Sequence, residues 1–200
     1  MRIPPLLQRP PERRIGTGRR VRFGRSRLAG LVLVAVVLAG CGGASQATGT
    51  TKTTKPLPAG RYPSEVSKMV CKTEAPHDVG EALGETASVT TPTWIDHLYT
   101  CHYDYGSGSM TLSVKELSSW AETLAYFHGL GTQLGVARTL PNLGQGAFQT
   151  TNGSVVVRKD WKVLLVDPTG LPPRFGNPPT TSSDIAVTVA DVILGCWAGD

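Results

Sequence analysis

Residues 61–200 of this chain are predicted to form one α+β domain, with helices packed mainly on one face of an antiparallel sheet of about five or six strands. Three observations favour this fold class. The side chains of Tyr99–Tyr105 alternate between aromatic or cysteine and polar, which is typical of a half-buried strand. The runs 155–157 and 163–166 are apolar on both faces, as in central strands. The segment 184–197 has only a narrow polar stripe, which indicates a largely buried helix.

The other helices follow from end signals and apolar spacing. Short helices are predicted over 63–70 and 77–83, because each has residues typical of a helix start or end. The C-terminal helix is expected to begin at a cap formed by Ser182 or Ser183. A longer helix is predicted where apolar residues recur at intervals of four, three and seven, at Trp120, Leu124, Phe127 and Leu134.

Short turns connect the predicted strands. Gly106–Gly108 reverses the chain after the first strand, into a returning strand over 110–115. Asn152-Gly153 is a strong two-residue turn signal, and it follows the segment 142–150. Asp160-Trp161 joins the two strands that are apolar on both faces.

The N-terminal segment is predicted to be a signal peptide rather than a membrane span. Only thirteen uncharged residues, 28–40, separate the last arginine from Cys41, whereas a helix needs about 20 to cross a bilayer. An arginine-rich stretch precedes this apolar run and small residues close it, the order found in a cleaved signal. Leu38-Ala39-Gly40-Cys41 resembles the lipobox of bacterial lipoproteins, so residues 1–40 would be removed between Gly40 and Cys41, and Cys41 would carry the lipid. An ordinary secretory signal with an incidental cysteine is the alternative.

Cleavage would change the charge of the protein. Nine of the 20 Lys and Arg residues lie in 1–40, together with one of the 15 acidic residues, so the chain from Cys41 onwards has 11 basic and 14 acidic side chains. The formal net charge of +5 comes from the removed segment, and it does not indicate a nucleic acid as partner. Residues 41–60 are rich in Gly, Ser and Thr and are predicted to be a lipid-anchored flexible tether. The expected location is the outer face of the cytoplasmic membrane.

Several motifs together resemble the small uncharacterised lipoproteins of actinobacteria. They are the lipobox, a threonine-rich tether, a helical cysteine at Cys71, an ALG turn at 82–84, an aromatic strand with a cysteine at 99–101, an LGQGAF segment at 143–148 and a closing cysteine helix. The resemblance covers most of the chain after the lipobox and implies the fold and the location. Because its motifs consist of structural glycines, cysteines and aromatic residues, it carries over no catalytic residue.

Three cysteines remain after Cys41, and an oxidising compartment favours a disulfide between two of them. We favour Cys71 with Cys101, a bridge that would join the first helix to the sheet. Closing a loop of about 30 residues would stabilise the fold by about 3–4 kcal/mol. Cys196 would then be buried near the C-terminus, or it would be the true partner of Cys71.

Two histidines are the candidate metal ligands. On one continuous strand His97 and His102 would point to opposite faces, because they are five residues apart. If Asp96-His97 lies in a loop, His97 could join His102 and Asp104 in a weak zinc or copper site. Two exposed histidines on a secreted surface are the simpler interpretation. The sequence has no nucleotide-binding or catalytic-serine motif, so no cofactor is expected.

The segment 170–183 is the candidate interaction loop. It is long for a connection inside a domain, and four prolines stiffen it. An arginine beside an aromatic residue is suited to anchoring an interface. A rigid crossover with Phe175 tucked under the last helix is the alternative. The residues proposed for contact are Pro172, Pro173, Arg174 and Phe175.

The sequence therefore predicts a membrane-anchored lipoprotein with a binding or accessory role and no enzymatic activity. Its partner would be a protein, a cell-wall component or a small ligand, besides the membrane that holds the lipid on Cys41. The alternative is a metal-dependent or hydrolytic enzyme that uses His97, His102 and Asp104.

Overall fold

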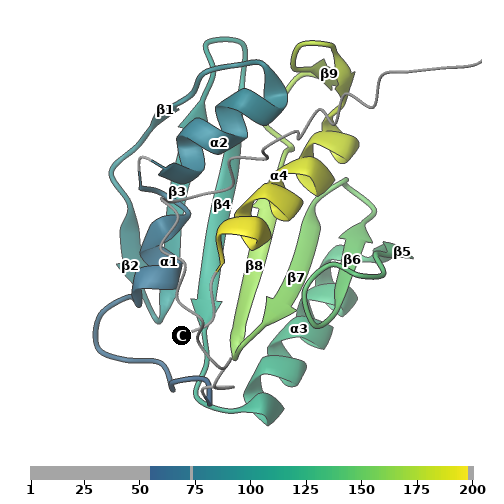
Figure 1. Ribbon diagram of the computed structural model, residues 1–200. Coiled ribbons are helices and arrows are strands. Elements are labelled where there is room, and N and C mark those ends of the chain that lie inside the picture. The colour runs from purple at the N-terminus through teal and green to yellow at the C-terminus, as the bar shows by residue number, and fades with distance from the viewer. Residues whose placement is uncertain (1–54, 73, 198–200) are drawn as a thin grey trace, which may run out of the picture. The chain divides into compact units, whose positions relative to one another are not determined.

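Figure 1 shows the computed structural model, which describes residues 55–72 and 74–197. The predictions on the signal peptide and on lipidated Cys41 concern residues outside this part of the chain. The helices are α1 (Glu65–Met69), α2 (Glu74–Leu83), α3 (Trp120–Leu134) and α4 (Ser182–Cys196). The strands are β1 (Ser88–Val89), β2 (Thr93–Ile95), β3 (Leu98–Asp104), β4 (Ser109–Glu116), β5 (Val136–Thr139), β6 (Ala147–Thr150), β7 (Val155–Lys159), β8 (Lys162–Asp167), β9 (Arg174–Phe175) and β10 (Thr180–Thr181).

The main sheet has eight strands in the order β1-β3-β4-β8-β7-β6-β5, with β2 also paired to β3, and β9 and β10 form a separate two-stranded sheet. All pairings are antiparallel, which confirms the predicted α+β class. The predicted count of five or six strands is too low. The missed strands β1, β2 and β5 have two, three and four residues, too few to show an alternating pattern.

Helices cover both faces of the sheet. Val155 and Val157 of β7 lie in the larger apolar core, together with residues of α1, α2 and α4. Val156, between them, faces the opposite side and packs in a smaller core with Phe127 of α3. Figure 1 accordingly shows α2 and α4 on the near side of the sheet and α3 behind it. The prediction that helices pack mainly on one face is correct for α1, α2 and α4, and α3 is the exception.

The helices begin where side chains cap their first turn. Ser119 has an extended backbone, and its hydroxyl accepts a hydrogen bond from the Glu122 amide at 3.2 Å. At α4 the capping residue is Thr181, whose hydroxyl accepts from the Asp184 amide at 3.1 Å. The predicted caps Ser182 and Ser183 are therefore wrong, because both residues already lie in the first turn of the helix.

The hairpin between β7 and β8 turns at the predicted pair, Asp160 and Trp161. Both residues have a positive φ, 49° and 58°. This is the conformation that a two-residue hairpin turn needs, because its twist matches that of the flanking strands. The turn brings Arg158 of β7 opposite Val163 of β8.

A disulfide joins Cys71, just after α1, to Cys101 of β3, with 6.1 Å between the Cα atoms, so the favoured pairing is confirmed. Beside it, the Tyr103 hydroxyl donates a hydrogen bond to the Val70 carbonyl oxygen. The alternative pairing of Cys71 with Cys196 is wrong, and the Cys196 sulfur lies 3.3 Å from a carboxylate oxygen of Asp78 on α2. None of the helices in residues 55–72 and 74–197 is both long and apolar enough to cross a membrane.

Candidate functional site

The predicted interaction loop is largely folded back onto the domain. Phe175 is only 5% exposed, and its ring meets the ring of Tyr105 edge-on at a centroid distance of 4.8 Å. Strand β9 pairs with β10, and the guanidinium of exposed Arg174 donates a hydrogen bond to the Pro179 carbonyl oxygen at 2.8 Å. Phe175 is therefore part of the core and does not anchor an interface. A contact through Pro173 and Arg174, which are exposed, stays a prediction.

The predicted metal ligands do not come together. His97 lies in the turn between β2 and β3 with a φ of 59°, and its ring meets Trp94 edge-on. His102 lies on the exposed side of β3, where its Nδ1 is 2.9 Å from the Thr111 hydroxyl. Within the described residues, His97, His102 and Asp104 form no cluster of ligand atoms. The alternative function that relied on this trio has no geometric support.

The three ligand-type side chains that do cluster in the described part of the chain are His77, Asp78 and Glu81, at the surface of α2. The imidazole of His77 lies between two carboxylates, with Nδ1 at 3.4 Å from Asp78 and Nε2 at 3.9 Å from Glu81. Both ring nitrogens thus face an acid, which is the geometry of ion pairs on a solvated helix. Exposed pairs of this kind contribute little to stability.

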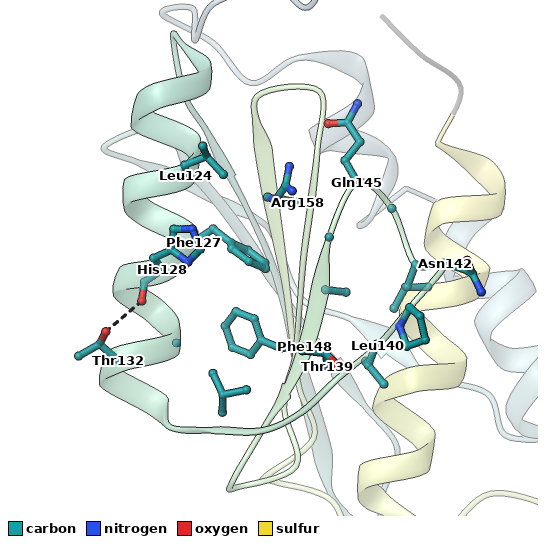
Figure 2. A pocket seen from close by; sticks show the side chains of 17 residues that line it. Leu124, Phe127, His128, Thr132, Thr139, Leu140, Asn142, Gln145, Phe148 and Arg158 are labelled. Carbon is teal, nitrogen blue, oxygen red and sulfur yellow. Dashed lines mark hydrogen bonds between the residues drawn. The ribbon is translucent and has the colours of Figure 1, made fainter.

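A cleft with a volume of about 880 Å³ lies on the side of the sheet that α3 covers. We call it the α3 cleft. Figure 2 shows it between α3 and the loop that leads from β5 to β6. Its lining residues come from α3 (Leu124, Phe127, His128, Gly131, Thr132), from β5, the loop and β6 (Val136, Thr139, Leu140, Pro141, Asn142, Leu143, Gly144, Gln145, Gly146, Ala147, Phe148) and from β7 (Arg158).

The loop that forms one wall of the cleft is held firmly against β7. The Gln145 amide donates to the Arg158 carbonyl oxygen, and the Arg158 amide donates to the Gly146 carbonyl oxygen, both at 2.9 Å. The side-chain amide of Gln145 donates to the Asp160 carboxylate at 3.1 Å. Leu143 is buried in the larger core. The LGQGAF segment, residues 143–148, is therefore fixed to β7 and to the larger core.

The two glycines of the LGQGAF segment are explained by close approach to β7. Gly144 has a φ of 58°, and a Cβ there would lie 2.6 Å from Cγ1 of Val157. A Cβ on Gly146 would lie 2.8 Å from Nε of Arg158 and 3.0 Å from Nη2. The absence of a side chain at Gly146 therefore lets the guanidinium of Arg158 lie directly against the loop backbone.

Arg158 is the most unusual side chain in the cleft. Its guanidinium lies 4.5 Å from the ring centre of Trp120 and 5.6 Å from that of Phe127. These are cation–π distances, with the guanidinium over the two aromatic rings. No described residue makes a hydrogen bond or an ion pair with the guanidinium, and its Nη1 is buried without a partner. Arg158 is half-buried overall, so its charge is only partly hydrated.

No family model, curated protein or solved structure matches this chain. The resemblance to actinobacterial lipoproteins therefore stays a prediction from the sequence, and the α3 cleft has to be interpreted from its own geometry. Sequence reasoning missed this site, although it had singled out both of its parts. The spacing predicted α3, and the LGQGAF segment was recognised, but only the fold shows that they face each other across Arg158.

Proposed function

We propose that this protein is a lipid-anchored binding protein at the outer face of the cytoplasmic membrane, whose folded domain holds a small molecule in the α3 cleft. The observation that carries the binding role is the cleft itself. The anchoring rests on the sequence, on the lipobox that ends at Cys41 and on the tether after it.

The size and the lining of the cleft support a small-molecule site. Ligand pockets typically have volumes of about 300–1,000 Å³ and combine apolar walls with a few polar groups. The α3 cleft has a volume of about 880 Å³ and presents Leu124, Phe127 and Phe148. Val136 in the lining and Trp120 next to Arg158 are 51% and 42% exposed, although both are large apolar residues. Trp120 is the first residue of α3 and Val136 follows its end, so exposed apolar side chains stand at both ends of the helix that forms one wall of the cleft.

The polar groups of the cleft favour binding over turnover. Its two ionisable lining residues are His128 and Arg158. The hydroxyl of Thr132 donates to the His128 carbonyl oxygen at 3.2 Å, so it is not activated by the imidazole. A nucleophile paired with a base, which hydrolytic chemistry requires, is not part of this lining.

The first experiment combines native mass spectrometry with a cleft-filling variant. The protein is released gently from membranes of its own host without reductant, and we expect a bound small molecule in addition to the lipid. The full-length protein is then titrated with the uncharged fluorescent dye N-phenylnaphthylamine, with equal detergent in all samples. Gly131 lies in the cleft, and a Cβ there would be 3.5 Å from Cζ of Phe148, so Gly131→Leu should fill the cleft and reduce dye binding about tenfold or more.

The matched control is Gly129→Leu. Gly129 lies on the same helix, but a Cβ there would meet nothing within 4 Å. Replacing a helical glycine raises helix stability by about 0.5–1 kcal/mol, but a Cβ at position 131 would lie 3.2 Å from Cγ2 of Val136, so melting curves of both variants must show that they are folded. Equal dye binding by the wild type and both variants, together with a native mass that contains no small molecule, would exclude the α3 cleft as a binding site.

A further inference from the structure

We infer that the ligand of the α3 cleft is an anionic amphiphile, whose single negatively charged group lies against Arg158 while its apolar part lies between α3 and the loop that leads from β5 to β6. This inference rests on the proposed function and names the chemical class of the ligand. Figure 2 shows Arg158 between Phe127 of α3 and Gln145 of the LGQGAF segment, in the position that the charged group would meet.

The first argument is that the guanidinium of Arg158 lacks hydrogen-bond partners among the described residues. A buried or half-buried guanidinium normally has a carboxylate or carbonyl partner, because desolvating an unpaired charge is costly. Here the Nη1 of Arg158 is buried and makes no hydrogen bond with any described residue. The guanidinium carbon lies over the rings of Trp120 and Phe127, which accept no conventional hydrogen bond from its N–H groups. These N–H groups have the fork geometry that fits carboxylate, sulfonate and phosphate oxygens.

The second argument is the charge around the site. The 17 residues that line the cleft include no Asp or Glu. The nearest acid along the chain, Asp160, is held outside the lining by the side-chain amide of Gln145 at 3.1 Å. With only His128 and Arg158 as ionisable lining residues, the cleft attracts anions and repels cations.

The third argument is the apolar path that leads away from Arg158. The rings of Phe127 and Phe148 meet edge-on at 4.9 Å and form a continuous apolar wall. Gly131 lets α3 approach this wall closely, because a Cβ there would lie 3.2 Å from Cγ2 of Val136 and 3.5 Å from Cζ of Phe148. Farther along, the lining continues with Val136 and Leu140. A ligand that fills this space needs an apolar body attached to its charged group.

Two dyes that differ by one charged group test the inference. N-phenylnaphthylamine is uncharged, and anilinonaphthalene sulfonate is the same ring system with a sulfonate. We expect the wild-type full-length protein to bind the sulfonate dye at least about tenfold more tightly, because charge-assisted hydrogen bonds are strong in a half-buried site. Arg158→Met should remove this preference, so that the ratio of the two dissociation constants falls to about one. Arg158→Lys should keep part of the preference, since it retains the charge but loses the fork geometry.

The outcomes separate this inference from the proposed function. If both dyes bind equally well and Arg158→Met changes neither affinity, the anionic class is wrong while the cleft remains a binding site. If Gly131→Leu also fails to change dye binding, both proposals are wrong. Arg158→Met should fold normally, since it replaces an unpaired charge with an apolar side chain of similar length, and its circular dichroism spectrum and melting curve check this.

A free amphiphile and an anionic membrane lipid would share this chemistry, and a second titration distinguishes them. Monomeric oleate offers one chain with a carboxylate, while phosphatidylglycerol vesicles offer a phosphate diester in a bilayer. Competition with the sulfonate dye by oleate alone identifies a free amphiphile, and competition by phosphatidylglycerol but not phosphatidylcholine vesicles identifies a lipid headgroup. If neither oleate nor phosphatidylglycerol displaces the dye, the anionic amphiphile is the wrong class.

Discussion

The two faces of the sheet differ in the size of their apolar cores and in how completely they are packed. The face under α1, α2 and α4 carries the larger apolar core, the disulfide and the buried Tyr103. The face under α3 has a small core around Phe127 and Phe148, an open cleft, and the guanidinium of Arg158, whose buried Nη1 makes no hydrogen bond within the described residues. A cleft and an unpaired charge both lower the stability of the folded state. Both lie on the face that has the smaller core.

The difference between the two cores separates the residues that stabilise the fold from those that line the candidate binding site. The strands β7 and β8 are shared by both faces, and their side chains alternate between the two cores. A substitution on one face should therefore change stability with little effect on binding, and a substitution on the other face should do the reverse. The predictions below test this separation from the largest expected effect to the smallest.

The largest effect is expected from a pair of neighbouring leucines on β8. Leu164 is fully buried in the larger core, whereas Leu165 is half-buried against the smaller one. Leu164→Ala should lower the free energy of unfolding by about 3–5 kcal/mol, because it leaves a cavity in a well-packed core. Leu165→Ala should cost about half as much. Urea denaturation measures both, and equal costs would mean that the two faces contribute equally to stability.

The next effect concerns the disulfide. Replacing both Cys71 and Cys101 by alanine opens a bridge that spans 30 residues. The free energy of unfolding should fall by about 3–4 kcal/mol, mainly because the unfolded chain gains freedom. Binding of N-phenylnaphthylamine, measured at a temperature where the variant is still folded, should stay the same. A loss of dye binding in the folded variant would show that the two faces are coupled.

The sequence was sufficient for the elements whose pattern repeats over several residues. Alternation predicted β3 and its buried face, and both apolar strands β7 and β8 are central and covered on both sides. Short elements have no such pattern, which is why β1, β2 and β5 were missed. β1 and β2 pair with the longer strand β3, and β5 pairs with β6, so these strands depend on tertiary pairing more than on their own sequence.

The candidate site could not be predicted, because it depends on contacts between distant segments. A lone arginine in a strand that reads as VVVRK gives no sign of whether it has a partner. The absence of a partner for Arg158 becomes evident only when Trp120, Phe127 and Gly146 surround it. The same limit explains the error at Phe175, whose aromatic ring beside an arginine looked suited to an interface but fills the core against Tyr105.

A smaller effect on stability, with a large effect on ligand choice, is expected from Gly146→Ala. The added Cβ would lie 2.8 Å from Nε of Arg158, so the guanidinium must move away from the loop. The free energy of unfolding should fall by about 1–2 kcal/mol, because the crowded atoms belong to a flexible side chain. The preference for anilinonaphthalene sulfonate over the uncharged dye should fall with it. Gly195→Ala is the control, because a Cβ there meets nothing within 4 Å, and an unchanged dye preference in Gly146→Ala would contradict the positioning role.

The smallest effect is a dependence on alkaline pH that acts through the larger core. Burial raises the pKa of Tyr103 and of Tyr105 above the ordinary value of 10.0, and the nearby Tyr105 and Glu85 carboxylate respectively add to the shift. The folded state therefore keeps these protons where the unfolded chain loses them. The contribution of these two tyrosines to the free energy of unfolding is fully present below about pH 10. Above that pH the free energy of unfolding falls by at most about 1.4 kcal/mol per pH unit for each tyrosine.

Urea denaturation on either side of this pH measures the slope, and Tyr105→Phe isolates one contribution. The Tyr105 hydroxyl is buried without a hydrogen-bond partner, so its removal should cost little at neutral pH and should keep the ring contact with Phe175. The variant should therefore lose stability less steeply than the wild type above about pH 10. If its slope equals that of the wild type, a different group limits the alkaline stability. Tyr103, which lies in the same core and also has a raised pKa, is the next group to replace.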